Sequence, residues 1–256
     1  MTDESLRTRM LRGDMLAGTF LKTPNLQMIE ILAMTGMDFV CLDAEHAPFD
    51  RSAIDACMAI GRAMNFPILV RVPDGNPAEI LKALDCGATG LVIPHVATPE
   101  KAANIAKWSR FGHGGRGYAG SSRWASYTTK TMPELLKQSA EETIVIAQIE
   151  EPEGVEAIDA IASTDGIDGL FVGPADLAVC LGVNNPAAPE VMQAMATVGA
   201  AAKKHGRAAM TFIPNMTKAQ ELANMGLSMF FVASEQSFIL DAARGVASDM
   251  KTIKKA

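Results

Sequence analysis

Residues 37–72 read MDFVCLDAEHAPFDRSAIDACMAIGRAMNFPILVRV, and the fold is predicted from this stretch outward. Two apolar runs, 38–43 and 67–72, have the composition of strands that are buried on both faces. Between them, apolar residues such as Ile54 and Met58 recur at helical spacing. The stretch therefore predicts a strand, a helix and a second strand that runs parallel to the first.

Apolar runs of this kind recur along the chain, with amphipathic segments between them. The eight runs are residues 16–20, 38–43, 67–72, 90–94, 143–150, 169–173, 207–213 and 229–234. Eight strand and helix units in 256 residues, without a linker rich in proline or serine, favour one (β/α)8 barrel, and an open doubly wound sheet is the alternative. We therefore predict an α/β fold in which residues 1–256 form a single TIM-barrel domain.

The composition excludes several classes of protein. Hydrophobic side chains make up 48% of the chain and charged ones 20%, as in a domain with a sizeable core. Because 23 Lys and Arg stand against 29 Asp and Glu, the net charge is −6, and neither nucleic acid nor an anionic membrane is an expected partner. The chain has no secretion signal and no run of about 18 apolar residues, so we expect a cytoplasmic protein.

Polar residues follow the apolar runs, at the place where a TIM barrel carries its catalytic groups. The second run ends in Asp43-Ala44-Glu45-His46, the third in Arg71, the fourth in Pro94-His95, the fifth in Gln148-Ile149-Glu150 and the sixth in Gly173-Pro174-Ala175-Asp176. Because the carboxyl ends of parallel strands meet at one end of a barrel, we expect these side chains to lie close together.

Two of these residues suggest a metal site. Glu150 ends a run that otherwise has the pattern of a buried strand, so its carboxylate needs a partner, either an Arg or a metal ion. Asp176 follows the next strand at the equivalent height, and two converging carboxylates repel unless a cation or a proton lies between them. Oxygen ligands suit Mg²⁺ or Mn²⁺, with Co²⁺ or Zn²⁺ as less favoured ions. Asp176 as a simple helix N-cap is the alternative.

Arg71 and His46 are candidates for the chemistry itself. The guanidinium of Arg71 would emerge at the barrel mouth, where it could grip a carboxylate or stabilise an oxyanion. A structural salt bridge from Arg71 to Asp43 or Glu45 is an equal alternative. His46 follows two acids within three residues, an arrangement that can adjust a general base toward neutral pH, although a loop histidine can also be merely exposed.

Taken together, these motifs resemble those of the HpcH/HpaI family of metal-dependent class II pyruvate aldolases. The resemblance runs from about Leu16 to the C-terminal helix and is carried by LDAEHAP (42–48), VRV (70–72), QIE (148–150) and VGPADL (172–177). It implies a carbon–carbon lyase that reversibly cleaves 4-hydroxy-2-oxo acids to pyruvate, or a close 2-keto acid, and an aldehyde. Such reactions belong to the catabolism of aromatic compounds or sugar acids.

The resemblance also implies a role for each matching residue. Glu150 and Asp176 would bind the divalent metal, which acts as a Lewis acid on the 2-keto acid. Gln148 and the backbone at Ala175 and Asp176 would hold pyruvate. Arg71 would help to hold the substrate and stabilise the charge of its enolate.

Proton transfer is implied for His46, with Asp43 beside it and Asp85 as a supporting acid. Asp85 lies near the end of a helix that returns to the opposite end of the barrel, so a neighbouring subunit must supply it. We make the same hypothesis for the glycine-containing segment 117–124. Because the family forms hexamers with an exchanged C-terminal helix, a hexamer is expected.

Three other interpretations stay open. A Schiff-base aldolase would need a desolvated lysine, and Lys22 is the lysine nearest to an expected carboxyl strand end. A metal-dependent lyase acting on acyl-CoA thioesters, such as citramalyl-CoA or malyl-CoA, could share the fold and the ligands. A barrel that binds a keto acid without catalysis is the third, since a fold does not establish a function.

Overall fold

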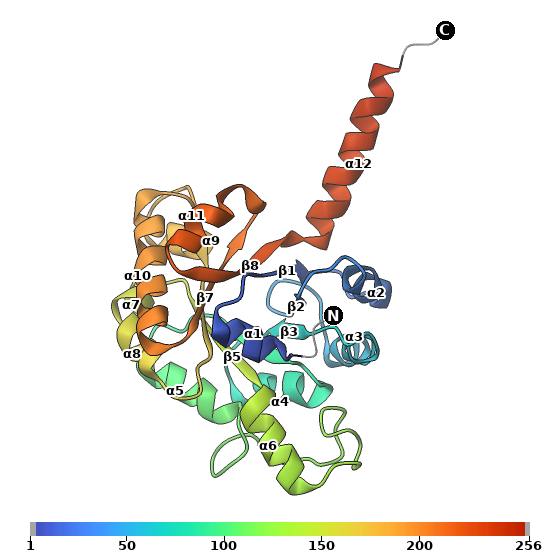
Figure 1. Ribbon diagram of the computed structural model, residues 1–256, viewed down its shortest axis with the longest axis vertical. Coiled ribbons are helices and arrows are strands. Elements are labelled where there is room, and N and C mark those ends of the chain that lie inside the picture. Colours follow the sequence, from blue (N-terminus) through green and yellow to red (C-terminus); the bar gives the residue numbers. More distant parts are fainter. Residues whose placement is uncertain (1–3, 254–256) are drawn as a thin grey trace.

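Eight parallel strands pair in chain order, and the last pairs with the first, so that the sheet closes into a barrel (Figure 1). The computed structural model describes residues 4–253. The strands are β1 (Leu16–Leu21), β2 (Phe39–Asp43), β3 (Ile68–Arg71), β4 (Gly90–Ile93), β5 (Ile144–Ile149), β6 (Gly169–Val172), β7 (Ala208–Ile213) and β8 (Leu227–Ser234). Each overlaps one of the eight predicted runs, which confirms the TIM barrel and excludes the open sheet.

Helices follow the strands and surround the barrel (Figure 1). They are α1 (Leu6–Arg12), α2 (Leu26–Ala33), α3 (Arg51–Ala63), α4 (Pro77–Cys86), α5 (Pro99–Trp108), α6 (Met132–Glu142), α7 (Pro152–Glu156), α8 (Ile158–Ser163), α9 (Pro174–Cys180), α10 (Pro189–His205), the short 3₁₀ helix η1 (Met216–Lys218), α11 (Ala219–Asn224) and α12 (Glu235–Thr252). Local signals set several starts: the side chains of Asn25, Asp50 and Asn76 accept hydrogen bonds from the first turns of α2, α3 and α4. No helix within residues 4–253 is both long and apolar enough to cross a membrane.

Aromatic rings fill the inside of the barrel. The ring of Phe231 lies 4.9 Å from that of Phe39 and 4.8 Å from that of Phe171, both edge to face. Gly18 permits this packing, because a Cβ atom on Gly18 would lie 2.5 Å from the Phe39 ring. A second apolar layer separates the strands from the helices. The interior is therefore a packed core, and chemistry is confined to the barrel's ends.

The amino-terminal helix α1 closes one end of the barrel. Leu6 and Met10 are 3% and 1% exposed and join the apolar cluster inside the barrel. Arg7 holds the helix in place, because its Nη2 donates to Oδ1 of the buried Asp168 at 2.7 Å. The strands begin at this closed end, so the candidate residues that follow them lie at the opposite end, the mouth.

The carboxy-terminal helix α12 stands away from the barrel (Figure 1). Within the described chain, Glu235 is its only buried residue, whereas Ile239, Val246 and Met250 are 55%, 72% and 68% exposed. An amphipathic helix that leaves apolar side chains uncovered lacks the packing that normally stabilises it. This geometry is compatible with the expected exchange of the C-terminal helix.

We expect Met10→Ala to lower the free energy of unfolding by about 2–5 kcal/mol, because it leaves a cavity beneath the barrel. Leu11→Ala is the matched control: the next residue of the same helix is 37% exposed, and its loss should cost about 0.5 kcal/mol or less. Urea unfolding followed by tryptophan fluorescence measures both. Equal losses in the two variants would contradict a closing role for α1.

Candidate active site

Strands β2, β3, β5 and β6 carry most of the predicted site residues to the barrel mouth. Asp43 and Arg71 end adjacent strands and are paired in register. Gln148 lies in β5 and Glu150 directly after it, while Asp176 lies in the first turn of α9, directly after β6. The structure therefore brings these residues to one end of the barrel, as the sequence predicted.

Arg71 and Asp43 form a two-pronged ion pair at the floor of the mouth. Nε and Nη2 of Arg71 donate to the two carboxylate oxygens of Asp43 at 3.1 and 2.9 Å, and Asp43 is fully buried. Burial opposes the charge of Asp43, but hydrogen bonding by Arg71 and the Arg71 charge keep its pKa below the ordinary value. The Nη1 atom of Arg71 makes no hydrogen bond within residues 4–253, so it can face a substrate.

The salt bridge considered as an alternative role for Arg71 is therefore present. It uses Nε and Nη2 of the guanidinium and leaves Nη1 without a partner in the described residues. Nε also lies 3.2 Å from Oε2 of Glu45. The Cζ atom of Arg71 lies over the Phe20 ring, 4.7 Å from its centre. These contacts fix the orientation of Arg71, which is what an oxyanion-stabilising group needs.

Glu150 is buried without an Arg or Lys partner in the described chain. It is 2% exposed, and no Arg or Lys side chain among residues 4–253 pairs with it. Its Oε1 accepts a hydrogen bond from the backbone N–H of His95 at 2.8 Å, and Nε2 of Gln148 donates to its Oε2. The simple Arg ion pair considered from the sequence is therefore wrong for Glu150.

Two further features make this part of the mouth suitable for a cation. The buried Oε1 of Gln148 has no hydrogen-bond partner in the described chain, so an acceptor oxygen is left beside the Glu150 carboxylate. A Cβ atom on Gly173 would lie 2.8 Å from Oε2 of Glu150, so the start of α9 is pressed against that carboxylate. The residues present fit a hard divalent ion.

Asp176 does not act as a helix cap. The N-cap of α9 is Gly173, and the Asp176 side chain is exposed and makes no hydrogen bond in the described residues. Within residues 4–253, no three His, Cys, Asp or Glu side chains converge on a ready-made metal site. Two protein carboxylates, completed by water and substrate oxygens, are nevertheless sufficient for Mg²⁺.

His46 stands at the lip of the mouth. Its side chain is 56% exposed, and its Nε2 lies 3.7 Å from Oε2 of Glu45. Its backbone N–H donates to Oδ1 of Asp43 at 3.1 Å, so Asp43 orients both Arg71 and the loop that carries His46. Burial raises the pKa of Glu45, and the nearby Glu150 adds to the effect, against the opposing charge of Arg71.

The sequence pattern assigned no chemical role to Glu45 or His95, yet both lie at the mouth beside the predicted site residues. Nδ1 of His95 lies 3.2 Å from Oε1 of Glu150 and 3.1 Å from Oε1 of Glu151, and its Nε2 lies 3.8 Å from Oε1 of Glu45. His95 also has a φ of 56°, a conformation that is uncommon outside glycine. In the sequence, only their position two residues after the end of a strand indicates that Glu45 and His95 belong to the site.

Lys22 is ion-paired. Its Nζ lies 3.4 Å from Oδ2 of Asp43, and its side chain is 34% exposed. A Schiff-base lysine is typically desolvated or placed next to another cation without a partner carboxylate. The surroundings of Lys22 therefore weigh against the Schiff-base alternative.

Asp85 lies at the end of the barrel opposite to the mouth, near the end of α4. It accepts a hydrogen bond from Arg116, whose guanidinium lies over the rings of Phe111 and Trp124, 4.7 and 4.8 Å from their centres. The backbone N–H of Trp124 donates to the carbonyl of Asp85 at 3.3 Å. Asp85 therefore does not approach His46 of the same chain.

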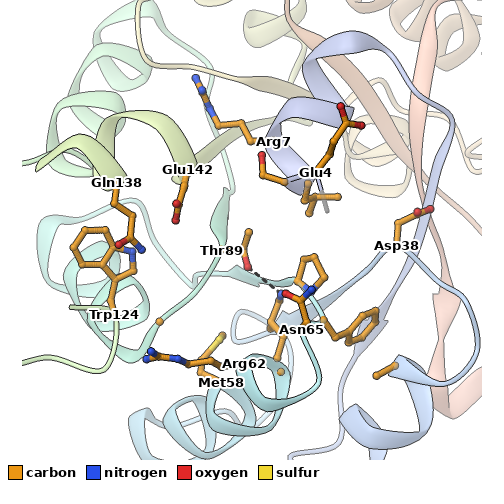
Figure 2. Close-up of a pocket in the computed structure, with 18 of the residues that line it drawn as sticks. Glu4, Arg7, Asp38, Met58, Arg62, Asn65, Thr89, Trp124, Gln138 and Glu142 are labelled. Atoms are coloured by element: carbon orange, nitrogen blue, oxygen red, sulfur yellow. Dashed lines mark hydrogen bonds between the residues drawn. The ribbon is translucent and has the colours of Figure 1, made fainter. Parts of the chain in front are cut away.

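A cavity of about 710 Å³ occupies this opposite end (Figure 2). Its lining includes Arg7, Arg62, Asn65, Thr89 and Trp124, which come from α1, from the end of α3, from the loops that lead into the strands and from the segment before α6. None of the residues grouped at the mouth lines it.

Comparison with known proteins agrees with this geometry. A family model described as HpcH/HpaI aldolase/citrate lyase matches residues 16–242. A protein named 5-keto-4-deoxy-D-glucarate aldolase from Klebsiella pneumoniae is 34% identical over 224 residues, which is 87% of each chain. The protein of that name from Citrobacter koseri is 36% identical over 225 residues, covering 87% of this chain and 86% of its own.

Solved structures are similar over nearly the whole chain. An HpcH/HpaI aldolase/citrate lyase family protein from Burkholderia cenocepacia has a TM-score of 0.90 at 34% identity and covers 96% of this chain and 99% of its own. An HpcH/HpaI aldolase from Desulfitobacterium hafniense has a TM-score of 0.91 at 25% identity, with 98% of both chains covered.

We expect Asp43→Asn to lower the free energy of unfolding at pH 7 by about 3 kcal/mol, because the buried Arg71 loses its counter-charge. The folded-state pKa of Asp43 is lowered, so its contribution is complete above the unfolded value of about 3.9 and is lost as the pH falls through the folded value. The difference between wild type and variant should therefore shrink below about pH 4.

Urea unfolding at pH 7 and at pH 3 measures this difference. Asp241→Asn, at a side chain that is 78% exposed on α12, is the control and should show little effect at either pH. A difference of the same size at both pH values would contradict the role assigned to the Asp43 charge.

Proposed function

The chain belongs to the HpcH/HpaI aldolase/citrate lyase family, and from this premise we propose how its site works and on which substrate. It is a carbon–carbon lyase of the aldolase type, which cleaves a hydroxy-keto acid to pyruvate and an aldehyde. The observation that carries the proposal for this site is the buried Glu150, which has no Arg or Lys partner among residues 4–253 and lies beside the unpaired Oε1 of Gln148.

The proposed substrate is a sugar-acid derivative with a carboxylate at each end. The relatives that match most of the chain are named for 5-keto-4-deoxy-D-glucarate, which is such a dicarboxylate. Aldol cleavage breaks the bond between the methylene carbon beside the ketone and the next hydroxyl-bearing carbon. The products are then pyruvate and an aldehyde that keeps the second carboxylate, so both halves of the substrate are anionic.

Glu150 and Asp176 would hold the divalent metal on which the family generally depends. We propose Mg²⁺ or Mn²⁺, because the protein ligands are carboxylate oxygens. When bound, the ion would supply Lewis-acid polarisation of the 2-keto acid.

The remaining residues would position pyruvate and move its proton. Gln148 and the backbone at Ala175 and Asp176 would bind the pyruvate carboxylate. The free Nη1 of Arg71 would stabilise the enolate oxygen. His46 would take a methyl proton, and its exposure at the lip lets it exchange that proton with water.

We propose further that the working enzyme is an oligomer, a hexamer in which α12 is exchanged between subunits. Two observations support an assembly: the apolar side chains of α12 are exposed, and Asp85 lies at the far end of the barrel from His46 of its own chain. A neighbour would then present Asp85, together with the segment 117–124, to the mouth of this subunit.

Pyruvate release from a racemic 4-hydroxy-2-oxo acid, coupled to lactate dehydrogenase, tests the proposed site. We expect release by chelator-stripped protein only after Mg²⁺ or Mn²⁺ is added, since the keto acid needs a Lewis acid. Glu150→Gln should lose about a hundredfold or more in kcat. Glu153→Gln, at an exposed carboxylate three residues away, is the control and should keep its activity.

Release without metal would overturn the roles of Glu150 and Asp176, and borohydride trapping would then examine Lys22. No release under either condition would favour the acyl-CoA lyase or the binding protein, which turnover of citramalyl-CoA or malyl-CoA distinguishes.

Mixing two inactive variants tests whether Asp85 acts in a neighbouring subunit. We expect His46→Ala and Asp85→Asn to be nearly inactive alone, but co-expressed chains should regain activity at about a quarter of their sites if subunits pair at random. Such a site joins an intact His46 on one chain to an intact Asp85 on the next.

His46→Ala mixed with Arg71→Ala is the matched control, because both lesions fall within one barrel and no mixed site is whole. Light scattering must show that each mixture forms oligomers. An inactive mixture of the His46 and Asp85 variants would contradict the shared site.

A further inference from the structure

Lys22 places an ammonium group at the mouth that the proposed chemistry does not use. It directly follows β1, and its side chain is 34% exposed. Its Nζ contacts Oδ2 of Asp43 at 3.4 Å, yet it donates no hydrogen bond within residues 4–253. A lysine ammonium has three donors. Lys22 can therefore bind an anion at the mouth.

Asp43 does not depend on Lys22 for its hydrogen bonds. Arg71 donates to both carboxylate oxygens of Asp43, and the backbone N–H of His46 donates to Oδ1. The longer contact from Lys22 adds a second cation to a carboxylate that is already paired. Since the hydrogen bonds of Asp43 are made by other groups, the partly exposed ammonium of Lys22 is available to a ligand.

A buried carboxylate fixes the backbone from which Lys22 extends. Glu235 is 3% exposed, and its two oxygens accept hydrogen bonds from the backbone N–H groups of Lys22 and Thr23 at 2.9 and 2.8 Å. Gln236 adds a hydrogen bond to Oγ1 of Thr23 at 3.2 Å. The stem of Lys22 is thus held at one place on the rim, while its flexible side chain can adjust to a bound anion.

The strand order decides which part of a substrate Lys22 can reach. In a closed barrel with strands in chain order, β1 lies opposite β5. Lys22 therefore stands across the mouth from Glu150, and Arg71 at the end of β3 lies between them along the rim. A substrate whose pyruvate half lies against β5 and β6 would point its other half toward β1.

We propose that Lys22 binds the carboxylate at the far end of the aldehyde, so that the enzyme prefers aldehydes that carry an anionic group. This inference rests on the proposed function, because it presumes that pyruvate lies beside Glu150. It assigns Lys22 to recognition of the second product and leaves Arg71 to the reacting oxygen.

The test compares two aldehydes of the same carbon skeleton in aldol addition to pyruvate. Tartronate semialdehyde carries a terminal carboxylate, and glyceraldehyde carries a hydroxymethyl group at the same position. We expect Lys22→Met to lower kcat/KM for tartronate semialdehyde by about 10- to 100-fold more than for glyceraldehyde, mainly through KM, because a charge-assisted hydrogen bond is lost. Lys22→Arg, which keeps the charge, should restore part of the preference.

Lys218→Met is the control, because Lys218 is exposed on η1 and follows β7 at the same end of the barrel. This variant should keep the preference of the wild type. If Lys22→Met lowered kcat/KM equally for both aldehydes, the inference would be overturned, since Lys22 would then act only through Asp43. If Lys22→Met changed kcat/KM for neither aldehyde, the inference would be overturned as well.

Failure of the inference can be distinguished from failure of the proposed function by proton exchange. A wild type that exchanges the methyl protons of pyruvate for deuterium, but does not prefer the anionic aldehyde, overturns the role of Lys22 alone. A wild type that neither exchanges these protons nor joins pyruvate to either aldehyde overturns both.

Discussion

Closure of the sheet between β8 and β1 is the constraint on which the site depends. All eight strands are parallel, so closure directs every carboxyl end to the same rim. Residues separated by more than a hundred positions in the sequence, such as Asp43 and Glu150, thereby come to one mouth. The seam is also where Glu235, which follows β8, holds the backbone at Lys22. The contacts that close the barrel therefore also position the side chains at its rim.

Charge is distributed unevenly around the mouth. Toward β1 to β3, Asp43 is buried with Arg71 and contacted by Lys22, so each charge has a partner. Toward β5 and β6, Glu150 is buried without Arg or Lys among the described residues, and Asp176 in the first turn of α9 makes no hydrogen bond within them. Because a buried carboxylate without a strong counter-charge is costly, this half of the mouth is the part suited to a cation. Under the proposed function, this uneven charge would orient a substrate that has two anionic halves.

The described chain contains only part of the proposed working site. Asp85 is fixed at the other end of the barrel by Arg116, which itself packs over two aromatic rings. Helix α12 extends away from its own barrel with apolar residues exposed. Both features have an explanation if subunits associate, because a neighbour would cover α12 and receive Asp85. Assembly and catalysis would then depend on the same contacts.

The sequence by itself determined the barrel and the rim. Buried strands are apolar runs of four to eight residues, and the polar residues that end them are adjacent in the chain, so Asp43, Arg71, Glu150 and Asp176 could be found by local pattern. Only the tertiary structure decided how these groups pair. Glu150 has no Arg or Lys partner among the described residues, although such residues follow other strands. The contacts of Glu45 and His95 and the anchoring of Lys22 by Glu235 join segments that are far apart in sequence. Such pairings depend on strand register and side-chain rotamers, which no local pattern records.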